Sequence, residues 1–206
     1  MAIRVHKGDL PASAAFGAAV AIDTETLGLN VSRDRLCVVQ LSRGDGSAEL
    51  VQIAPGQSRA PNLEAMLADP KIVKLFHFGR FDMATLCKAF GVMPEPVYCT
   101  KIASKLARTY TDRHGLKDLV KELLGLDLSK QQQSSDWGAG ALSDAQLAYA
   151  ASDVLHLHAL RDKLDAILAR EKRDSLAKAA FAFLPERVRL DLAGFETMDV
   201  FSHAAP

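Results

Sequence analysis

Residues 18–25 read Ala-Ala-Val-Ala-Ile-Asp-Thr-Glu, a short apolar run that leads into two acidic residues, Asp23 and Glu25. The apolar run predicts a buried strand over 18–23. Because side chains two apart on a strand point to the same face, the two carboxylates converge while Thr24 faces away. Two carboxylates that no cation neutralises repel each other, and a divalent cation relieves that repulsion. The stretch is typical either of a metal site or of a polar strand end that continues into a loop.

The rest of the chain alternates between strand and helix patterns. Two further apolar runs, over 35–41 and 49–53, flank the turn signal Gly44-Asp45-Gly46 and predict a β-meander with the first strand. Beyond it the patterns predict a helix over 61–68, a strand over 72–78, a helix over 81–90, a short strand at 97–98 and one long helix over about 143–170. This order predicts the α/β class, with one mixed sheet flanked by helices.

Length and composition predict one ordinary globular domain. The chain has 206 residues, of which 49% are hydrophobic and 24% charged. We expect a single domain with a core over about 18–170 and a helical C-terminal tail over about 171–206. The net charge is zero, which argues against extended, salt-driven binding to nucleic acid but leaves room for a short, enclosed nucleic-acid substrate. The three scattered cysteines predict reduced thiols, and we expect a cytoplasmic protein without membrane association.

Three further residues stand out, although each also has an ordinary explanation. Asp82 follows a predicted buried strand, where an acid is also favoured simply by the dipole of the helix that begins there. Tyr149 and Asp153 are four residues apart on the long predicted helix, so they stack on one face beside its apolar stripe. Taken alone, they fit a tyrosine at the edge of the core and an exposed aspartate.

The constellation of these residues resembles the DEDDy family of 3′-5′ exonucleases. Its three motifs correspond to Asp23-Thr24-Glu25, His77-x-x-x-Phe81-Asp82 and Tyr149-x-x-x-Asp153. The segments Lys130-x-x-Gln133-x-Ser135-Asp136-Trp137 and Leu142-Ser143-x-x-Gln146 resemble the ribonuclease D branch. The compact nano-ribonuclease C group of alphaproteobacteria is similar over nearly the whole chain. The resemblance implies a ribonuclease H-like fold.

The same resemblance implies hydrolysis of a phosphodiester bond with two divalent cations, Mg²⁺ or Mn²⁺. Asp23 would bridge both ions, Glu25 and Asp153 would hold the first, and Asp82 would serve the second. Tyr149 would orient or deprotonate the attacking water. With an ordinary pKa near 10, this tyrosine needs nearby positive charge to act as a base at neutral pH.

The implied substrate is very short RNA, especially 5′-phosphorylated dinucleotides such as pGpG, and the implied assembly is a homo-octameric ring. Ribonuclease D carries additional helical nucleic-acid-binding domains, and here only a tail follows residue 170, so we expect long structured RNA to be a poor substrate. A broader 3′-5′ exonuclease acting on longer RNA or on DNA 3′ ends is the alternative. A non-catalytic binding module is less consistent with the presence of all four acids and the tyrosine.

Several residues are candidates for contacts with the substrate. Leu29 either inserts as a wedge between the terminal bases or packs in the core. The only tryptophan, Trp137, either stacks on a base or packs beside Tyr149, and packing is the favoured interpretation. The full set of predicted substrate-binding residues is Thr24, Leu29, His77, Phe81, Arg113, Lys130, Gln133 and Ser135.

A local group of basic residues lies in the middle of this otherwise neutral chain. Lys101, Lys105 and Arg108 fall on one face of a helix, and Arg113, His114 and Lys117 follow them. A solvated helix face is the first interpretation. The second is that a ring of subunits turns this face inward to hold phosphate.

Overall fold

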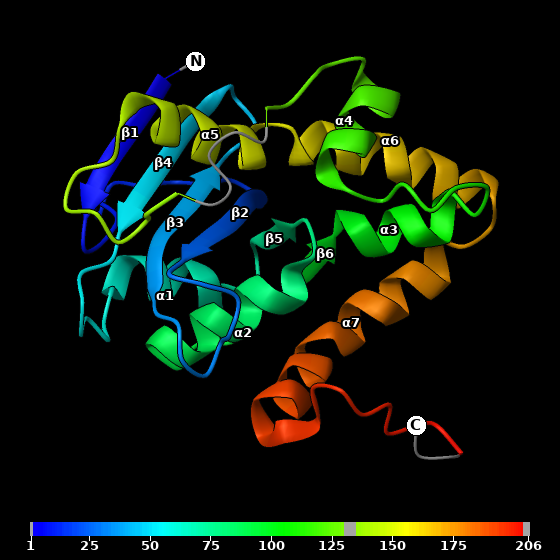
Figure 1. Cartoon of the computed structure of the whole chain (residues 1–206). Helices are drawn as coiled ribbons and strands as arrows, with labels where there is room; N and C mark the ends of the chain where they lie inside the picture. The colour runs from blue at the N-terminus through cyan, green and yellow to red at the C-terminus, as the bar shows by residue number, and fades with distance from the viewer. Residues whose placement is uncertain (1, 130–134, 204–206) are drawn as a thin grey trace.

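A mixed sheet forms the centre of the computed structural model, which describes residues 2–129 and 135–203. Within these residues the sheet has six strands in the order β1-β4-β3-β2-β5-β6 (Figure 1). The strands are β1 (Ala2–Lys7), β2 (Ala19–Thr26), β3 (Leu36–Ser42), β4 (Ser47–Gln52), β5 (Val73–Phe76) and β6 (Val97–Cys99). The helices are α1 (Pro61–Ala68), α2 (Gly79–Phe90), α3 (Thr100–Ala107), α4 (Leu116–Leu124), α5 (Asp144–Leu155), α6 (Leu157–Arg170), α7 (Asp174–Leu190) and a terminal π-helical turn (Asp191–Phe195). The predicted α/β class with a mixed sheet is confirmed.

The predicted meander is present, since β2 pairs antiparallel with β3 and β3 pairs antiparallel with β4. Strands β5 and β6 continue the sheet in parallel beyond β2. Strand β1 was not predicted from the sequence. It runs parallel to β4 at the edge of the sheet. Its side chains are largely exposed, so the strand carries no apolar run that would reveal it. An ion pair of 2.6 Å between Arg4 and Glu49 joins it to β4.

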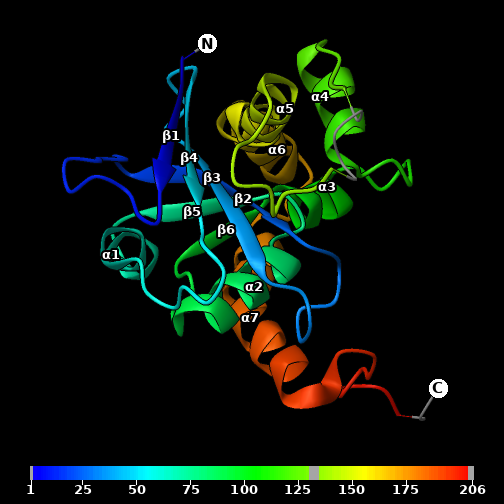
Figure 2. The ribbon, with the colours of Figure 1, turned by 60° about the vertical axis from the view of Figure 1, so that its left-hand side comes forward.

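The two faces of β2 meet different helices. Asp23 and Glu25 point toward Asp153 of α5, whereas Thr24 points to Asp82 of α2. Because neighbouring side chains on a strand alternate between faces, α5 and α2 cover opposite sides of the sheet (Figure 2). The four acids of the predicted motifs therefore lie on β2 and on the helices that cover its two faces.

The long helix predicted over 143–170 is two helices. Helix α5 ends at Leu155 and α6 begins at Leu157, with His156 between them. The predicted capping box is present at the start of α5, where Ser143 and Gln146 bond reciprocally. Helix α5 packs on the strands and α6 packs against α3 and α4. The apolar stripe continues through both halves, and for this reason it did not reveal the break.

The C-terminal segment folds back against the core. Helix α7 packs on α2 and β6, and the ring of Phe181 lies 4.5 Å from that of Tyr98. Its end brings Glu196 to the rim of the cavity described below. None of the helices in the described parts of the chain is both long and apolar enough to cross a bilayer.

Candidate active site

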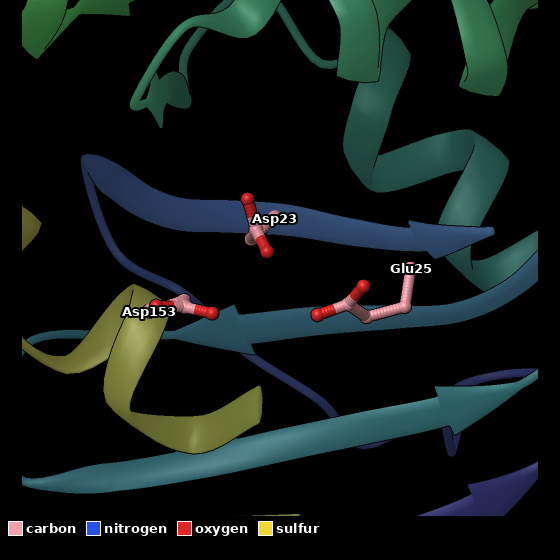
Figure 3. Close-up of side chains that lie close together, drawn as sticks. All are labelled: Asp23, Glu25 and Asp153. Atoms are coloured by element: carbon pink, nitrogen blue, oxygen red, sulfur yellow. The ribbon is translucent and has the colours of Figure 1, made fainter. Parts of the chain in front are cut away.

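Three carboxylates converge at the centre of the sheet. Asp23 and Glu25 extend from β2, Asp153 extends from α5, and one oxygen of each lies within 4.8 Å of the others (Figure 3). The pair on β2 points the same way because the two residues are separated by one position on a strand. Asp153 lies opposite them because α5 packs across β2, β3 and β4.

The fourth acid, Asp82, lies beside this group rather than in it. It is buried in the first turn of α2, and its Oδ1 accepts a 2.6 Å hydrogen bond from the hydroxyl of Thr24. Its negative charge raises the pKa values of Asp23, Glu25 and Asp153. Asp82 therefore acts electrostatically on the other three acids although it lies outside their group.

Burial raises the pKa of all four acids, and repulsion by neighbouring acids raises those of Asp23, Glu25 and Asp153 further. Desolvation is the largest cause in each case. It raises the pKa of Glu25 to about 9 and those of Asp82 and Asp153 to about 7, and it holds the pKa of Asp23 well above its ordinary range. No lysine or arginine contributes to any of these four shifts. These shifts favour protonated carboxyls in the metal-free protein, and no basic side chain among their causes opposes them.

Tyr149 lies one helical turn before Asp153 on α5. The Tyr149 hydroxyl favours the charged form of the Asp153 carboxyl, which lowers the pKa of that carboxyl and so opposes the effect of burial. Burial and the nearby acids raise the pKa of Tyr149 above its ordinary value near 10. Trp137 is buried and packs beside the tyrosine ring with the centroids 6.0 Å apart, as predicted.

An open cavity of about 570 Å³ adjoins the acidic cluster. Among the predicted substrate-binding residues, Thr24, Leu29, His77 and Phe81 line it, whereas Arg113 and Ser135 do not. Lys130 and Gln133 lie outside the described residues. The other lining residues are Asp23, Glu25, Thr26, Phe78, Asp82, Gly115, Leu116, Lys117, Leu128, Ser129, Tyr149, Asp153 and Glu196.

Leu29 stands at the rim of the cavity with 88% of its surface exposed. The interpretation that it packs in the core is therefore wrong. It also lines a second cavity of about 960 Å³. The two cavities share four lining residues: Leu29, Phe78, Phe81 and Glu196. An apolar side chain that projects between two cavities is free to contact a planar ligand.

The basic helix face is not uniformly solvated. Arg108 is fully buried, donates to Oγ of Ser104 at 2.9 Å and to the carbonyl of Arg113 at 2.7 Å, and pairs with Glu122. The prediction that it lies on a solvated face is wrong, because helical spacing alone does not show the loop that folds over it. Lys105 is exposed, as predicted.

Several residues of the cavity wall were not predicted from the sequence, and Phe78 and Glu196 are two of them. Phe78 has a left-handed backbone (φ 66°) and an exposed ring, over which the ammonium group of Lys101 lies 4.3 Å from the centroid. It occupies an unspecified position of the second motif, so no pattern marked it. Glu196 follows the last helical turn, and no feature of the nearby sequence links it to the site.

The donor set suits hard divalent cations. Mg²⁺ and Mn²⁺ prefer carboxylate oxygens, and the described residues place three such groups within 4.8 Å without a basic partner. Binding cations would offset the repulsion that contributes to the raised pKa values of Asp23, Glu25 and Asp153.

Comparison with known proteins gives the family. Residues 9–169 match the 3′-5′ exonuclease family. Ribonuclease D of Gluconacetobacter diazotrophicus is 39% identical over 154 residues, which is 75% of this chain and 39% of that protein. Ribonuclease D of Granulibacter bethesdensis is 37% identical over 174 residues, or 84% of this chain and 44% of that protein. The chain thus spans less than half the length of these curated relatives.

Solved structures agree with this match over the whole fold. Brucella melitensis NrnC with bound Mg²⁺ has 58% identity and a TM-score of 0.96, over 99% of this chain and 100% of that one. The same protein bound to pGG has 60% identity and the same TM-score and coverage. Escherichia coli RNase D, an exoribonuclease involved in structured RNA processing, has 28% identity and a TM-score of 0.75, over 84% of this chain and 45% of that one. The resemblance inferred from the motifs is confirmed, and the chain belongs to the 3′-5′ exonuclease family.

Proposed function

We propose that this protein is a metal-dependent 3′-5′ exoribonuclease of the DEDDy type that hydrolyses very short RNA to mononucleotides. Its preferred substrates are 5′-phosphorylated dinucleotides such as pGpG. The observation that carries the proposal is the meeting of Asp23, Glu25 and Asp153 within 4.8 Å beside an open cavity. The 60% identity to NrnC bound to pGG supports the choice of substrate.

The proposal includes two divalent cations, Mg²⁺ or Mn²⁺. Asp23 would hold both cations. Glu25 and Asp153 would hold the first cation, and Asp82 would hold the second. When bound, the cations supply an activated water and stabilise the charge on the departing 3′ oxygen. The structure of Brucella melitensis NrnC with bound Mg²⁺, at 58% identity, supports a metal at this type of site.

Tyr149 orients the attacking water. Tyr149 lies one helical turn before Asp153 and lines the same cavity, and its phenol oxygen has lone pairs that accept a hydrogen bond from the water. Its raised pKa keeps the phenol neutral in the metal-free protein. Tyr149→Phe keeps the packing against Trp137 and removes only the hydroxyl, so it should lower kcat more than it raises KM.

Leu29 is the proposed wedge, because its exposed side chain projects at the rim of the cavity. We assign the 5′ phosphate to a polar cap that draws on Arg113, Lys130 and Ser135. Arg113 is exposed and lies outside the cavity wall of a single chain, which fits a contact made in an assembly. We propose a cytoplasmic homo-octamer, and a stable monomer in light scattering at micromolar concentration would contradict that assembly.

The alternative function, a broader 3′-5′ exonuclease on longer RNA or DNA, also has an observation in its favour. The second cavity adjoins the first and has a volume of about 960 Å³. It therefore offers room for additional nucleotides of a longer RNA or DNA strand. The similarity to Escherichia coli RNase D points the same way.

The proposed function is tested with purified protein and a 5′-labelled RNA dinucleotide. We expect a labelled mononucleotide in Mg²⁺, no product in a chelator, and recovery when Mg²⁺ or Mn²⁺ is added back. A trinucleotide that loses its 5′ nucleotide first would contradict the direction of cleavage. Full activity in the chelator would contradict the role of the acids.

A further inference from the structure

His77 takes part in a chain of hydrogen bonds whose direction the chemistry determines. Oγ1 of Thr100 donates to the carbonyl of Phe76 at 3.1 Å, and Nδ1 of His77 lies 2.9 Å from the same Oγ1. A carbonyl only accepts, and a hydroxyl has a single proton to give. The proton of Thr100 is therefore committed to Phe76, so Nδ1 of His77 carries a proton and donates it to Thr100.

This direction leaves the other ring nitrogen of His77 as an acceptor. A neutral imidazole has one N–H, and here it is on Nδ1, so Nε2 presents a lone pair. Burial lowers the pKa of His77 to about 3, which keeps the ring neutral at physiological pH. Thr100 is completely buried, so water does not compete for its hydrogen bonds.

Nε2 of His77 has no hydrogen-bond partner within residues 2–129 and 135–203. The His77 side chain is half-buried and so is not sealed from solvent. His77 lines the cavity beside Asp23 and Glu25. The ring thus offers a fixed acceptor at the wall of the substrate cavity.

The chemistry of this acceptor selects what it binds. Phosphate oxygens at neutral pH are acceptors themselves and find no partner at Nε2. Nucleosides offer two kinds of donor, the ribose hydroxyls and the N–H groups of the bases. We propose that His77 is a specificity residue that accepts a hydrogen bond from such a donor of the bound nucleoside, and that Thr100 is the positioning residue that fixes its tautomer. This assignment rests on the proposed function.

The test compares pGpG with three analogues whose 3′ nucleoside lacks one donor each, namely the 2′-deoxy, the 3′-deoxy and the inosine form. An acceptor left unpaired costs on the order of tenfold in kcat/KM. We expect the wild type to show such a loss for one analogue. That analogue identifies whether the ribose or the base supplies the hydrogen-bond donor. In His77→Leu the parent substrate should lose the same factor and the discrimination should disappear.

A second measurement does not depend on activity. ¹⁵N NMR of protein labelled at histidine should show His77 protonated at Nδ1 and bare at Nε2, with the resonance assigned by its absence from His77→Leu. Thr100→Val removes the acceptor for Nδ1, so it should change this signal and weaken the discrimination. Thr85→Val is the matched control, because the Thr85 hydroxyl is buried without a partner in the described residues.

The outcomes separate the two proposals. Absence of hydrolysis for every nucleotide in Mg²⁺ would overturn the proposed function and this assignment with it. Hydrolysis with equal kcat/KM for all four substrates, or with discrimination unchanged in His77→Leu, would overturn only the role of His77. A wild-type spectrum with the proton on Nε2 would also overturn it, whatever the activity.

Discussion

The hydroxyl of Thr24 donates a 2.6 Å hydrogen bond to Oδ1 of Asp82 and so joins two of the three acidic motifs across the sheet. Both side chains are buried. Thr24 faces away from Asp23 and Glu25, and this orientation is what brings it to α2. Thr24, the middle residue of the first motif, thus holds Asp82 in place beside the group formed by Asp23, Glu25 and Asp153.

Thr24→Val should shift the pH dependence of catalysis. The hydrogen bond from Thr24 lowers the pKa of Asp82, which burial raises to about 7. Removing the bond should raise this pKa further, so the acidic limb of the kcat/KM profile should move up by about one pH unit. Thr85→Val on the same helix is the control, and an unchanged limb in Thr24→Val would show that the bond does not tune Asp82.

Asp153→Ala should lower kcat by several orders of magnitude and leave the fold intact. The substitution removes a proposed cation ligand, but it also relieves repulsion among buried carboxylates. The melting temperature in a chelator should therefore hold or rise. Asp162→Ala, at an exposed position of α6, should match the wild type in both measurements. Near wild-type turnover of Asp153→Ala in Mg²⁺ would show that the site is elsewhere.

The stability of the metal-free protein should fall as the pH rises. The pKa of Glu25 is raised from 4.5 to about 9, so the folded state holds a proton that the unfolded state releases. A raised folded-state pKa gives stability that is complete below the unfolded pKa and is lost as the pH rises through the folded one. We expect the melting temperature in a chelator to decline between about pH 5 and pH 9.

Two comparisons check that this decline comes from the acidic cluster. In Glu25→Gln the melting temperature should decline less steeply with pH, because the substitution removes one of the groups that titrate. Added Mg²⁺ should raise the melting temperature more at pH 8 than at pH 6, because cations and protons compete for the same oxygens. A melting temperature that declines equally in Glu25→Gln and the wild type would exclude Glu25 as a source.

Leu29→Ala should weaken substrate binding without changing stability. Its side chain is 88% exposed, so the free protein loses little buried surface. Contact with a base would bury it, and losing that contact should raise the Kd for a dinucleotide by about tenfold. Leu176→Ala on α7, where the leucine is 59% exposed, is the matched control. Equal Kd values for Leu29→Ala and the wild type would rule out the wedge.

The parts of the site that follow from local periodicity were predictable from the sequence. The convergence of Asp23 and Glu25 follows from strand alternation, and the start of α5 follows from the capping box at Ser143. The partnership of Thr24 with Asp82 was not predictable, because it depends on which helix covers the opposite face of β2.

Features set by distant neighbours also escaped prediction. Strand β1 is held at the sheet edge by pairing with β4, not by an apolar pattern of its own. Arg108 is buried because Glu122 and the carbonyl of Arg113 fold over its guanidinium, which helical spacing does not reveal. The position of Glu196 depends on how α7 packs against α2.

The most direct test of the central claim is the Mg²⁺-dependent kcat/KM for 5′-phosphorylated RNAs of two, five and ten nucleotides, measured side by side. A phosphate held by fixed donors contributes roughly 1.5–3 kcal/mol for each charge-assisted hydrogen bond. We therefore predict that the dinucleotide is cleaved fastest and that it loses this advantage when its 5′ phosphate is removed. Equal kcat/KM for all three lengths would contradict the account and favour a general 3′-5′ exonuclease.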